Sequence, residues 1–458
     1  MTVNRRNMLA AGLGISAAAA AATAKPAAAQ TVAARDTVAR PTLFDFAPGL
    51  QINAPQDQSA LLQAAIDRAA DKEIPLILPP GTFRAADLRL RAGTRLIGAS
   101  GATVLEFSGG PAFITADKAG GLLIEGIVFN GAFKAFDDMR GSGLLSLSRS
   151  KDVVLQDIEI KASAHIGLSL VEVAGRVSGV SIRDVLDAAI KSLDAKGLEI
   201  TGSRIEGSGN NGILVWRSEH GEDGTIVSGN RISKIRNASG GTGEFGNGIN
   251  VFRAGSVIVS NNRIADCAYS AVRGNAASNI QIIANSCERL GEVAIYSEFG
   301  FQGAVIANNI VDGAATGVSV TNFNEGGRLA VIQGNLIRNL FRREHEVEDK
   351  RGEGIGVEAD AVVTGNTIEG APTVGIQVGW GTYLRDVAVT GNVIRQSAVG
   401  ISISSAPGTG ACLIANNLIA STRDGAIRAM TRGVVFGPDL AREPDKAERV
   451  TLSGNVAV

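Results

Sequence analysis

A short phrase that closes on asparagine returns between residues 202 and 458, and it limits the fold more than any other feature. Ile or Val usually follows this asparagine by one or two places, and the nine copies are Asn230, Asn262, Asn285, Asn309, Asn335, Asn366, Asn392, Asn417 and Asn455. A second phrase, Gly-Ile-x-Val, alternates with it and, with weaker copies, starts at Gly143, Gly167, Ala189, Gly212, Gly248, Ser270, Ala294, Gly317, Gly354, Gly375, Gly400 and Gly425. Most steps are 21 to 25 residues, a period typical of a solenoid.

The local period identifies the kind of solenoid. Apolar residues alternate within each phrase, which predicts strands rather than helices. Short strands closed by Gly or Asn turns favour a single-stranded parallel β-helix of about 12 coils, stacked about 4.8 Å apart. Asparagine suits the recurring corner because it tolerates left-handed backbone, and its amide can bond to the copies above and below.

The first 29 residues read as an export signal. Arg5 and Arg6 precede a weakly apolar, Ala-rich run, and Ala27-Ala28-Ala29 ends it. Paired arginines with a mild apolar core and Lys25 near the cleavage site favour the twin-arginine route, although Met8 stands where Phe is usual. We therefore expect a periplasmic or secreted protein that meets the twin-arginine translocase during export and has no membrane anchor. Residues 30–56 are expected to be a linker.

Charge and cysteine content exclude several classes. The chain has 44 basic and 45 acidic residues, so no net field gathers nucleic acid. Cys267, Cys287 and Cys412 form neither a disulfide framework nor a metal spacing and are expected to be buried thiols. No cofactor motif is found; Ca²⁺ remains an option without a motif to support it.

Residues 57–100 are expected to cap the first coil, ahead of a β-helix over 101–458. Residues 57–70 have apolar positions at helical spacing with Ser59 as N-cap, and 75–83 read as a strand closed by a Pro-Gly turn. This helix and the Leu-Pro-Pro-Gly-Thr-Phe strand resemble the pectin-lyase-like superfamily of right-handed parallel β-helices. With its signal and repeats the chain resembles, more narrowly, exported β-helix repeat proteins of unassigned activity. The resemblance implies a substrate groove on the outer face of one sheet.

Two insertions mark a candidate groove. The distance from each turn asparagine to the next Gly-Ile-type strand is mostly 8 or 9 residues, but it is 18 from Asn230 to Gly248 and 19 from Asn335 to Gly354. The inserts, about 236–247 and 340–353, enter the same sheet four coils apart, about 19 Å, which suits about four sugar units. The second insert is rich in charge and is interpreted as an exposed loop or a groove lid.

The scarce aromatic residues fall on or beside that sheet. In Gly-Ile-x-Val strands the x position and the residue after Val point outward. Rings stack on sugars and arginines pair with carboxylates, so the expected substrate-binding residues are Lys191, Trp216, Arg217, Asn250, Phe252, Asn322, Phe323, Gln377, Trp380 and Tyr383. The alternative is that these side chains cover coil edges or pack under the inserts.

Candidate catalytic residues follow from position, because no polygalacturonase, pectate-lyase or epimerase signature is present. A uronate lyase or epimerase needs a base and a cation, which Arg253 or Arg273 could supply with Tyr296 and His345. A hydrolase would use Glu298 and Glu358, two coils or about 9.6 Å apart. A row of solvated salt bridges is the simpler account of these charges.

Three functions remain open. The chain is expected to act on or bind an acidic or neutral polysaccharide, as a lyase, epimerase or glycoside hydrolase. The alternative is a non-catalytic binding or envelope scaffold protein. A third option is self-association through an unprotected end, unless residues 436–448 cap it.

Overall fold

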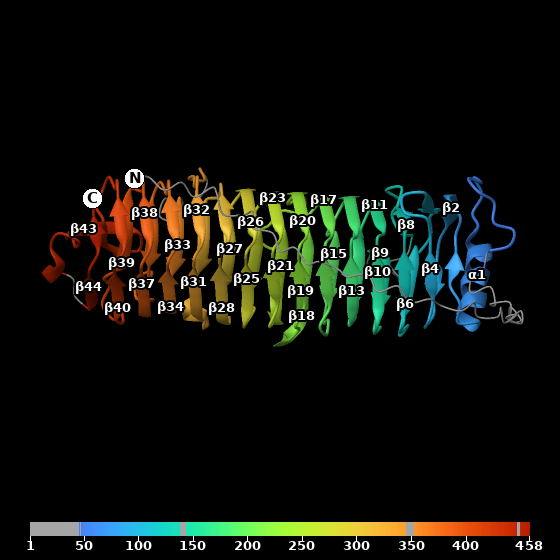
Figure 1. The fold of residues 1–458 in the computed structure, drawn as a ribbon, viewed down its shortest axis with the longest axis horizontal. Coiled ribbons are helices and arrows are strands. Elements are labelled where there is room, and N and C mark those ends of the chain that lie inside the picture. Colours follow the sequence, from blue (N-terminus) through green and yellow to red (C-terminus); the bar gives the residue numbers. More distant parts are fainter. Residues whose placement is uncertain (1–44, 46, 138–142, 345–351, 447–448) are drawn as a thin grey trace, which may run out of the picture. The chain divides into compact units, whose positions relative to one another are not determined.

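The computed structural model describes residues 45, 47–137, 143–344, 352–446 and 449–458. The predicted export signal and the first part of the predicted linker lie outside these residues. The described residues form three sheets of fifteen strands each, and from β1 to β42 successive strands along the chain go to successive sheets (Figure 1). A parallel β-helix is therefore confirmed.

Up to β42, each sheet takes every third strand. Sheet 1 consists of β1 (Leu76–Ile77), β4 (Arg95–Ile97), β7 (Leu123–Glu125), β10 (Val153–Gln156), β13 (Gly175–Ser178), β16 (Glu199–Thr201), β19 (Ile226–Ser228), β22 (Ile258–Ser260), β25 (Ile280–Ile283), β28 (Gln302–Ala307), β31 (Arg328–Gln333), β34 (Ala359–Thr364), β37 (Arg385–Thr390), β40 (Cys412–Ala415) and β44 (Val450–Ser453). Sheet 2 consists of β2 (Gly81–Ala85), β5 (Thr103–Phe107), β8 (Ile127–Asn130), β11 (Glu159–Ser163), β14 (Ser181–Val185), β17 (Arg204–Ser208), β20 (Arg231–Ile235), β23 (Arg263–Cys267), β26 (Ser286–Leu290), β29 (Ile310–Asp312), β32 (Leu336–Arg338), β35 (Thr367–Glu369), β38 (Val393–Arg395), β41 (Leu418–Ala420) and β45 (Val456–Ala457).

Sheet 3 carries the Gly-Ile-x-Val strands. It consists of β3 (Leu88–Leu90), β6 (Ile114–Asp117), β9 (Gly143–Ser148), β12 (Ile166–Val171), β15 (Ile190–Leu193), β18 (Ile213–Glu222), β21 (Ile249–Gly255), β24 (Val272–Asn275), β27 (Val293–Glu298), β30 (Thr316–Val320), β33 (Glu353–Val357), β36 (Val374–Val378), β39 (Val399–Ser404), β42 (Ile427–Thr431) and β43 (Val434–Asp439). The structure has about fourteen coils instead of the predicted twelve, because β3 and β6 lack the phrase that was counted.

The strands stack in register, and this builds a continuous core. Ile213 on β18 pairs with Ile249 on β21, which pairs with Val272 on β24. All three side chains are fully buried. Inward positions therefore repeat at the same place in each coil, and the side chains between them point away from the core, as the alternation predicts.

The asparagine corner is a hydrogen-bonded ladder. The backbone N–H and the side-chain Nδ2 of Asn309 both donate to Oδ1 of Asn335 one coil later, at 2.9 and 3.0 Å, while Nδ2 also donates to the carbonyl of Ile282 one coil earlier at 2.9 Å. The prediction that these asparagines themselves are left-handed is wrong. The left-handed residue is the one before, such as Asn308 with φ 57°, because this places the asparagine amide inside the stack.

A helix covers the first coil. The helix α1 (Ser59–Asp71) buries Leu62, Ala65 and Ile66 and packs on β1–β4, which already belong to the three sheets. The predicted N-cap at Ser59 is wrong by one residue, because the helix starts there and Gln58 precedes it. The Ser59 hydroxyl instead accepts a hydrogen bond from the backbone N–H of Ala86, 2.8 Å away.

The far end of sheet 3 is closed differently. The strand β43 pairs antiparallel with β42, so it covers that edge of the sheet, in keeping with the expected capping role of residues 436–448. Two short 3-10 helices, η1 (Phe323–Glu325) and η3 (Pro444–Lys446), lie between strands. No helix among the described residues is long and apolar enough to cross a membrane.

The three cysteines are free and buried, as predicted. Cys267 pairs in register with Leu290, and Cys287 with Ile264 and Val311, so the first two thiols do not face each other. Burial raises the pKa of Cys287 and of Cys412 to about 12 and raises that of Cys267 further. They act as small apolar core residues.

Candidate functional site

Both inserts enter sheet 3, as predicted. The first precedes β21 and the second precedes β33, and these strands are separated in the sheet by β24, β27 and β30. Of the second insert, residues 345–351 with the candidate His345 lie outside the described residues. Its beginning at 340–344 and its end at 352–353 are described.

The first insert packs against the outer face of the sheet and does not project from it. The carbonyl of Glu244 accepts a hydrogen bond from the side chain of Asn211 at 3.2 Å, and Asn247 Nδ2 donates to the carbonyl of Gly243 at 2.9 Å. Asn250 lies beneath the insert and is 4% exposed. The insert thus covers most of the side chain that is expected to contact substrate.

Trp216 and Phe252, two of the predicted substrate-binding aromatic residues, contact each other and neighbouring side chains. The rings of Trp216 and Phe252 meet edge to face with centroids 5.9 Å apart. The Lys191 ammonium lies 5.7 Å from the Trp216 ring, and the Arg253 guanidinium 4.7 Å from that of Phe252. Trp216 Nε1 also donates to Asn250 Oδ1 at 3.1 Å. These contacts fit the alternative in which the side chains pack beside an insert.

Two other predicted cations are held by the protein as well. Arg217 Nη1 donates to the carbonyl of Ala195 at 3.5 Å, and Arg253 Nη1 donates to the carbonyl of Ser218 at 2.9 Å.

Phe323 is the first residue of η1, and the Arg385 guanidinium lies over its ring, 4.5 Å from the ring centroid. Asn322 is left-handed with φ 70°, and its Oδ1 accepts from the N–H of Phe299 at 3.2 Å.

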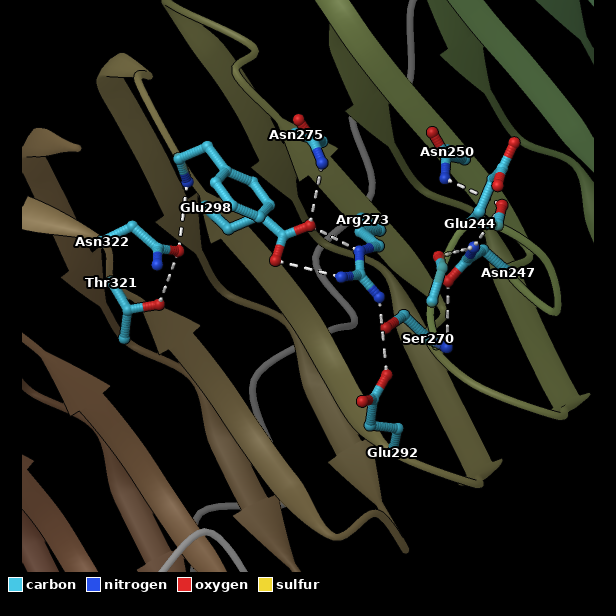
Figure 2. A network of polar contacts seen from close by, with 12 residues as sticks. Glu244, Asn247, Asn250, Ser270, Arg273, Asn275, Glu292, Glu298, Thr321 and Asn322 are labelled. Carbon is cyan, nitrogen blue, oxygen red and sulfur yellow. Dashed lines mark hydrogen bonds and ion pairs between the residues drawn. The ribbon is translucent and has the colours of Figure 1, made fainter. Parts of the chain in front are cut away.

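Arg273 occupies the centre of a buried ion network (Figure 2). Its Nε and Nη2 donate to the two carboxylate oxygens of Glu298 at 2.6 and 3.0 Å, and its Nη1 lies 3.6 Å from Glu292. Asn275 Nδ2 donates to Glu298 Oε1 at 3.2 Å. Burial raises the pKa of Glu298, and Arg273 acts against this rise. The guanidinium is thus committed to protein carboxylates.

The same network joins the two inserts. Arg343 of the second insert lies 3.5 Å from Glu292, and its guanidinium lies 5.4 Å from the ring centroid of Tyr269. The hydroxyl of Tyr269 donates to the carbonyl of Gly241 in the first insert at 2.9 Å. The described part of the second insert therefore meets the first insert through Tyr269.

An open hollow of about 560 Å³ lies over β27, β30, β33 and β36. We call it the glutamate pocket. Its lining includes the polar and aromatic residues Glu292, Tyr296, Glu353, Glu358, Gln377, Trp380 and Tyr383. The last two face each other across a short turn after β36, with backbone bonds of 3.0 and 3.1 Å in both directions. Six predicted residues meet here: Tyr296, Asn322, Glu358, Gln377, Trp380 and Tyr383.

Sequence reasoning missed Glu353 and Glu292. Gly356 on β33 lies between Ser319 and Gln377 in the outward row of the sheet, and Glu353 Oε2 lies 3.7 Å from the place that a Cβ on Gly356 would occupy. The missing side chain therefore leaves room for a carboxylate on the sheet surface. A glycine at an outward position in an otherwise side-chain-bearing row was the available signal.

The second predicted glutamate of the hydrolase pair does lie in the pocket. Glu358 is 8% exposed, and its Oε2 accepts a hydrogen bond from the N–H of Phe323 at 2.7 Å. Glu298, its predicted partner, is 2% exposed and is held by Arg273. Burial raises the pKa of Tyr296 to about 12, so this phenol keeps its proton at neutral pH. No cluster of metal-binding side chains occurs within the described ranges.

Comparisons with known proteins add the family. A model of the right-handed β-helix region matches residues 166–337 and again 220–394, which together span half of the 458 residues. No curated protein matches the chain in sequence.

Several solved structures resemble this one at low identity. Among them are the pre-mature gene product 12 of bacteriophage phi29 (TM-score 0.48, 16% identity, 86% of this chain and 57% of that one) and PfbA, a surface adhesin of Streptococcus pneumoniae (0.45, 15%, 85% and 92%). A third is the A-module of the mannuronan C-5 epimerase AlgE6 of Azotobacter vinelandii (0.42, 16%, 90% and 97%). This chain thus spans little more than half the length of the phage protein.

Proposed function

The chain belongs to the family of right-handed β-helix proteins, and on this fold we propose that it binds an extended polysaccharide across the outer face of sheet 3. The glutamate pocket is the centre of that binding surface. The observation that carries the proposal is the gathering of Tyr296, Trp380 and Tyr383 around one open hollow with buried carboxylates. Rings and carboxylates of this kind provide stacking surfaces and hydrogen-bond acceptors for sugar hydroxyls.

The sugar in this pocket is neutral. The pocket is lined by Glu292, Glu353 and Glu358, and no lysine or arginine occurs among its described lining residues. A uronate carboxylate placed here would meet no described basic side chain in the lining, and Glu292 is already paired with Arg273 and Arg343. The nearby Arg273 already binds Glu298 and Glu292, so it is not available to hold a substrate carboxylate.

Hydrolysis is the second candidate function, and Glu353 with Glu358 supports it. Both carboxylates belong to the same pocket, and Glu358 is held by the N–H of Phe323 while Glu353 lies over Gly356. Two glutamates in one sugar site are the minimum that acid and base catalysis of glycoside cleavage requires. Lyase or epimerase chemistry through Arg273 and Tyr296 has less support, because the first is ion-paired and the second stays protonated.

Binding and turnover are separable in one experiment. A panel of neutral and acidic polysaccharides is tested for affinity and for release of reducing ends with the wild type and with Trp380→Ala and Tyr383→Ala. Each variant is expected to weaken binding about 10-fold, equivalent to about 1.4 kcal/mol of lost ring contact. Phe133→Ala removes a 53% exposed ring outside the pocket and is the control.

The outcomes decide among the candidates. If Glu353→Gln and Glu358→Gln each lower reducing-end release by about 100-fold or more while binding persists, the protein is a hydrolase. Binding without turnover in the wild type indicates the scaffold alternative. If no polysaccharide binds, or if Trp380→Ala and Tyr383→Ala bind like the wild type, the proposal is wrong.

We also propose that the protein works in the periplasm or outside the cell. The support is the paired Arg5 and Arg6 ahead of an Ala-rich run. In a bacterial host, Arg5→Lys with Arg6→Lys is expected to leave the protein in the cytoplasm, as seen by fractionation. Unchanged export would contradict use of the twin-arginine translocase.

A further inference from the structure

A third long connection leads from sheet 2 into sheet 3, besides the two inserts. Residues 131–142 precede β9, as residues 236–248 precede β21 and residues 339–352 precede β33, whereas every other connection into sheet 3 up to β42 has six residues or fewer. Residues 138–142 lie outside the described part of the chain. Since β9, β21 and β33 follow one another at intervals of four strands, the long connections recur about every 19 Å along the sheet.

A hollow of about 600 Å³ lies at the connection before β9. We call it the hydroxyl hollow. It extends over β3, β6, β9 and β12, which are two strands before this connection and two after it. The glutamate pocket extends over β27, β30, β33 and β36 and has the same relation to the connection before β33. The two hollows are therefore equivalent in place and eight strand spacings apart, about 38 Å.

One row of positions that face away from the core passes through both hollows. The strand register continues this row without a shift from β3 to β36. Its residues are Arg89, Thr115, Ser146 and Ser169 on the first four strands and, eight strands later, Tyr296, Ser319, Gly356 and Gln377. All of them except Gly356, which has no side chain, line one of the two hollows. Sheet 3 thus presents the same surface twice, with different side chains.

Hydroxyl groups and one ion pair supply polar atoms to the hydroxyl hollow. Thr115, Ser146 and Ser148 are partly exposed in its lining. Arg149 Nε donates to Asp117 Oδ1 at 2.7 Å, and the Ser148 hydroxyl donates to the same oxygen at 2.7 Å. The side chains of Arg149 and Asp117 are 50% and 49% exposed, so this pair also presents polar edges to a ligand in the hollow.

The charges of this hollow balance, which suits a neutral sugar. Arg89 and Arg149 offset Asp117 and Glu172 among its described lining residues. Hydrogen bonds from Arg149 lower the pKa of Asp117 to about 2, so this carboxylate stays ionised and has no proton to give to a glycosidic oxygen. The hollow therefore has the chemistry to hold a glycan and lacks the protonated acid that cleavage requires.

We infer that the hydroxyl hollow is a second glycan-binding site, which holds a neutral stretch of the same polysaccharide about 38 Å from the glutamate pocket. This inference rests on the proposed function and adds the length of the substrate. About eight sugar units of about 5 Å each separate the two sites. A chain of about twelve units or more can occupy both sites at once, whereas shorter chains fill them separately.

Oligosaccharides of two lengths test the inference. The neutral glycan that binds best in the polysaccharide panel is used as a tetrasaccharide and as a chain of about sixteen units. Calorimetric titration of the wild type is expected to find two tetrasaccharides per protein chain. The long chain is expected to bind at least about 10-fold more tightly than the tetrasaccharide, because its second contact forms within the complex.

Two variants alter the hydroxyl hollow without changing the glutamate pocket. Asp117→Ala/Arg149→Ala removes the ion pair, and Ser146→Leu fills the floor of the hollow. Each is expected to bind one tetrasaccharide with the affinity of the glutamate pocket and to lose the advantage of the long chain. Asp266→Ala/Arg289→Ala removes a bidentate surface pair from sheet 2 and is the control. Circular dichroism checks the fold of all three variants.

The outcomes separate the inference from the proposed function. If the wild type binds a single tetrasaccharide, which Trp380→Ala weakens and Asp117→Ala/Arg149→Ala does not, the inference is wrong and the proposed function stands. Two tetrasaccharides per chain in both hollow variants would also overturn the inference. If no glycan binds the wild type, both are wrong.

Discussion

The Nε of Arg273 lies 2.6 Å from Oε1 of Glu298 on the next strand of the sheet, and its Nη2 lies 3.0 Å from Oε2 (Figure 2). The side chains are 11% and 3% exposed. A buried bidentate ion pair stabilises the fold only while both partners remain, because removing one partner leaves the other as an unpaired buried charge.

Arg273→Met is therefore expected to lower the free energy of unfolding by about 3 kcal/mol at pH 7, measured by denaturant unfolding. The substitution removes the group that opposes the burial-induced rise in the pKa of Glu298. A carboxyl whose folded pKa exceeds its unfolded value loses stability as pH rises through that interval. The deficit should therefore shrink as the pH is lowered from 7 to 5.

The control is a pair of the same type on the surface. Arg289 and Asp266 lie 2.6 Å apart with side chains 60% and 42% exposed, so Arg289→Met should destabilise the fold far less than Arg273→Met. Arg273→Met/Glu298→Leu should recover part of the loss. Equal costs for the buried and the surface substitution would contradict a buried ion network.

The asparagine ladder should be strongest in its middle. The side chain of Asn309 donates to Asn335 and Ile282 and accepts two bonds from Asn285, at 2.9 and 3.0 Å. Asn309→Ala leaves buried polar groups without partners, so we expect a loss of at least about 3 kcal/mol. Asn455→Ala at the last rung should cost roughly half as much. Similar Tm changes for the two variants would argue against a cooperative ladder.

The absence of a side chain at Gly356 should control access of glycans to the glutamate pocket. A Cβ there meets Glu353 Oε2 at an ordinary contact distance of 3.7 Å, so Gly356→Ala should bind glycans like the wild type. Gly356→Leu should displace the Glu353 carboxylate and weaken binding by about 10-fold; because Gly356 is buried, circular dichroism checks the fold of this variant. Calorimetric titration of both variants tests this. Unchanged binding by Gly356→Leu would mean that glycans do not reach the pocket.

The three cysteines should not react with thiol reagents while the protein is folded. Burial raises the pKa of Cys287 and Cys412 to about 12, and the thiolate is the reactive form. A disulfide reagent at pH 8 should label fewer than one thiol per folded chain and three after denaturation. Rapid labelling of the native protein would show that the coils open.

The repeat was enough to predict the fold. Gly212-Ile213-Leu214-Val215 places Ile213 and Val215 inward, and their full burial follows from alternation alone. The number of coils was underestimated because β3, with the sequence Leu-Arg-Leu, carries no Gly-Ile phrase. The corner asparagines were recognised, but their backbone was not, because which residue of the turn is left-handed depends on the hydrogen bonds of the stack.

The candidate site was predicted only in part. Alternation placed Tyr296 and Gln377 on the correct face, and both line the pocket. It could not show that Arg273 is bound by Glu292, which lies outside the Gly-Ile phrase, or that Asn250 is covered by the first insert. Such contacts depend on how loops fold over the sheet, and neither period nor spacing encodes loop conformation.

The most direct measurement of the central claim is a crystal structure with the oligosaccharide that binds most tightly. The account predicts sugar rings over sheet 3 between Tyr296 and Gln377, with one ring stacked on Trp380 or Tyr383 and hydroxyls within hydrogen-bond distance of Glu353 and Glu358. A sugar bound on the outer face of sheet 1 or sheet 2, with the glutamate pocket empty, would contradict it.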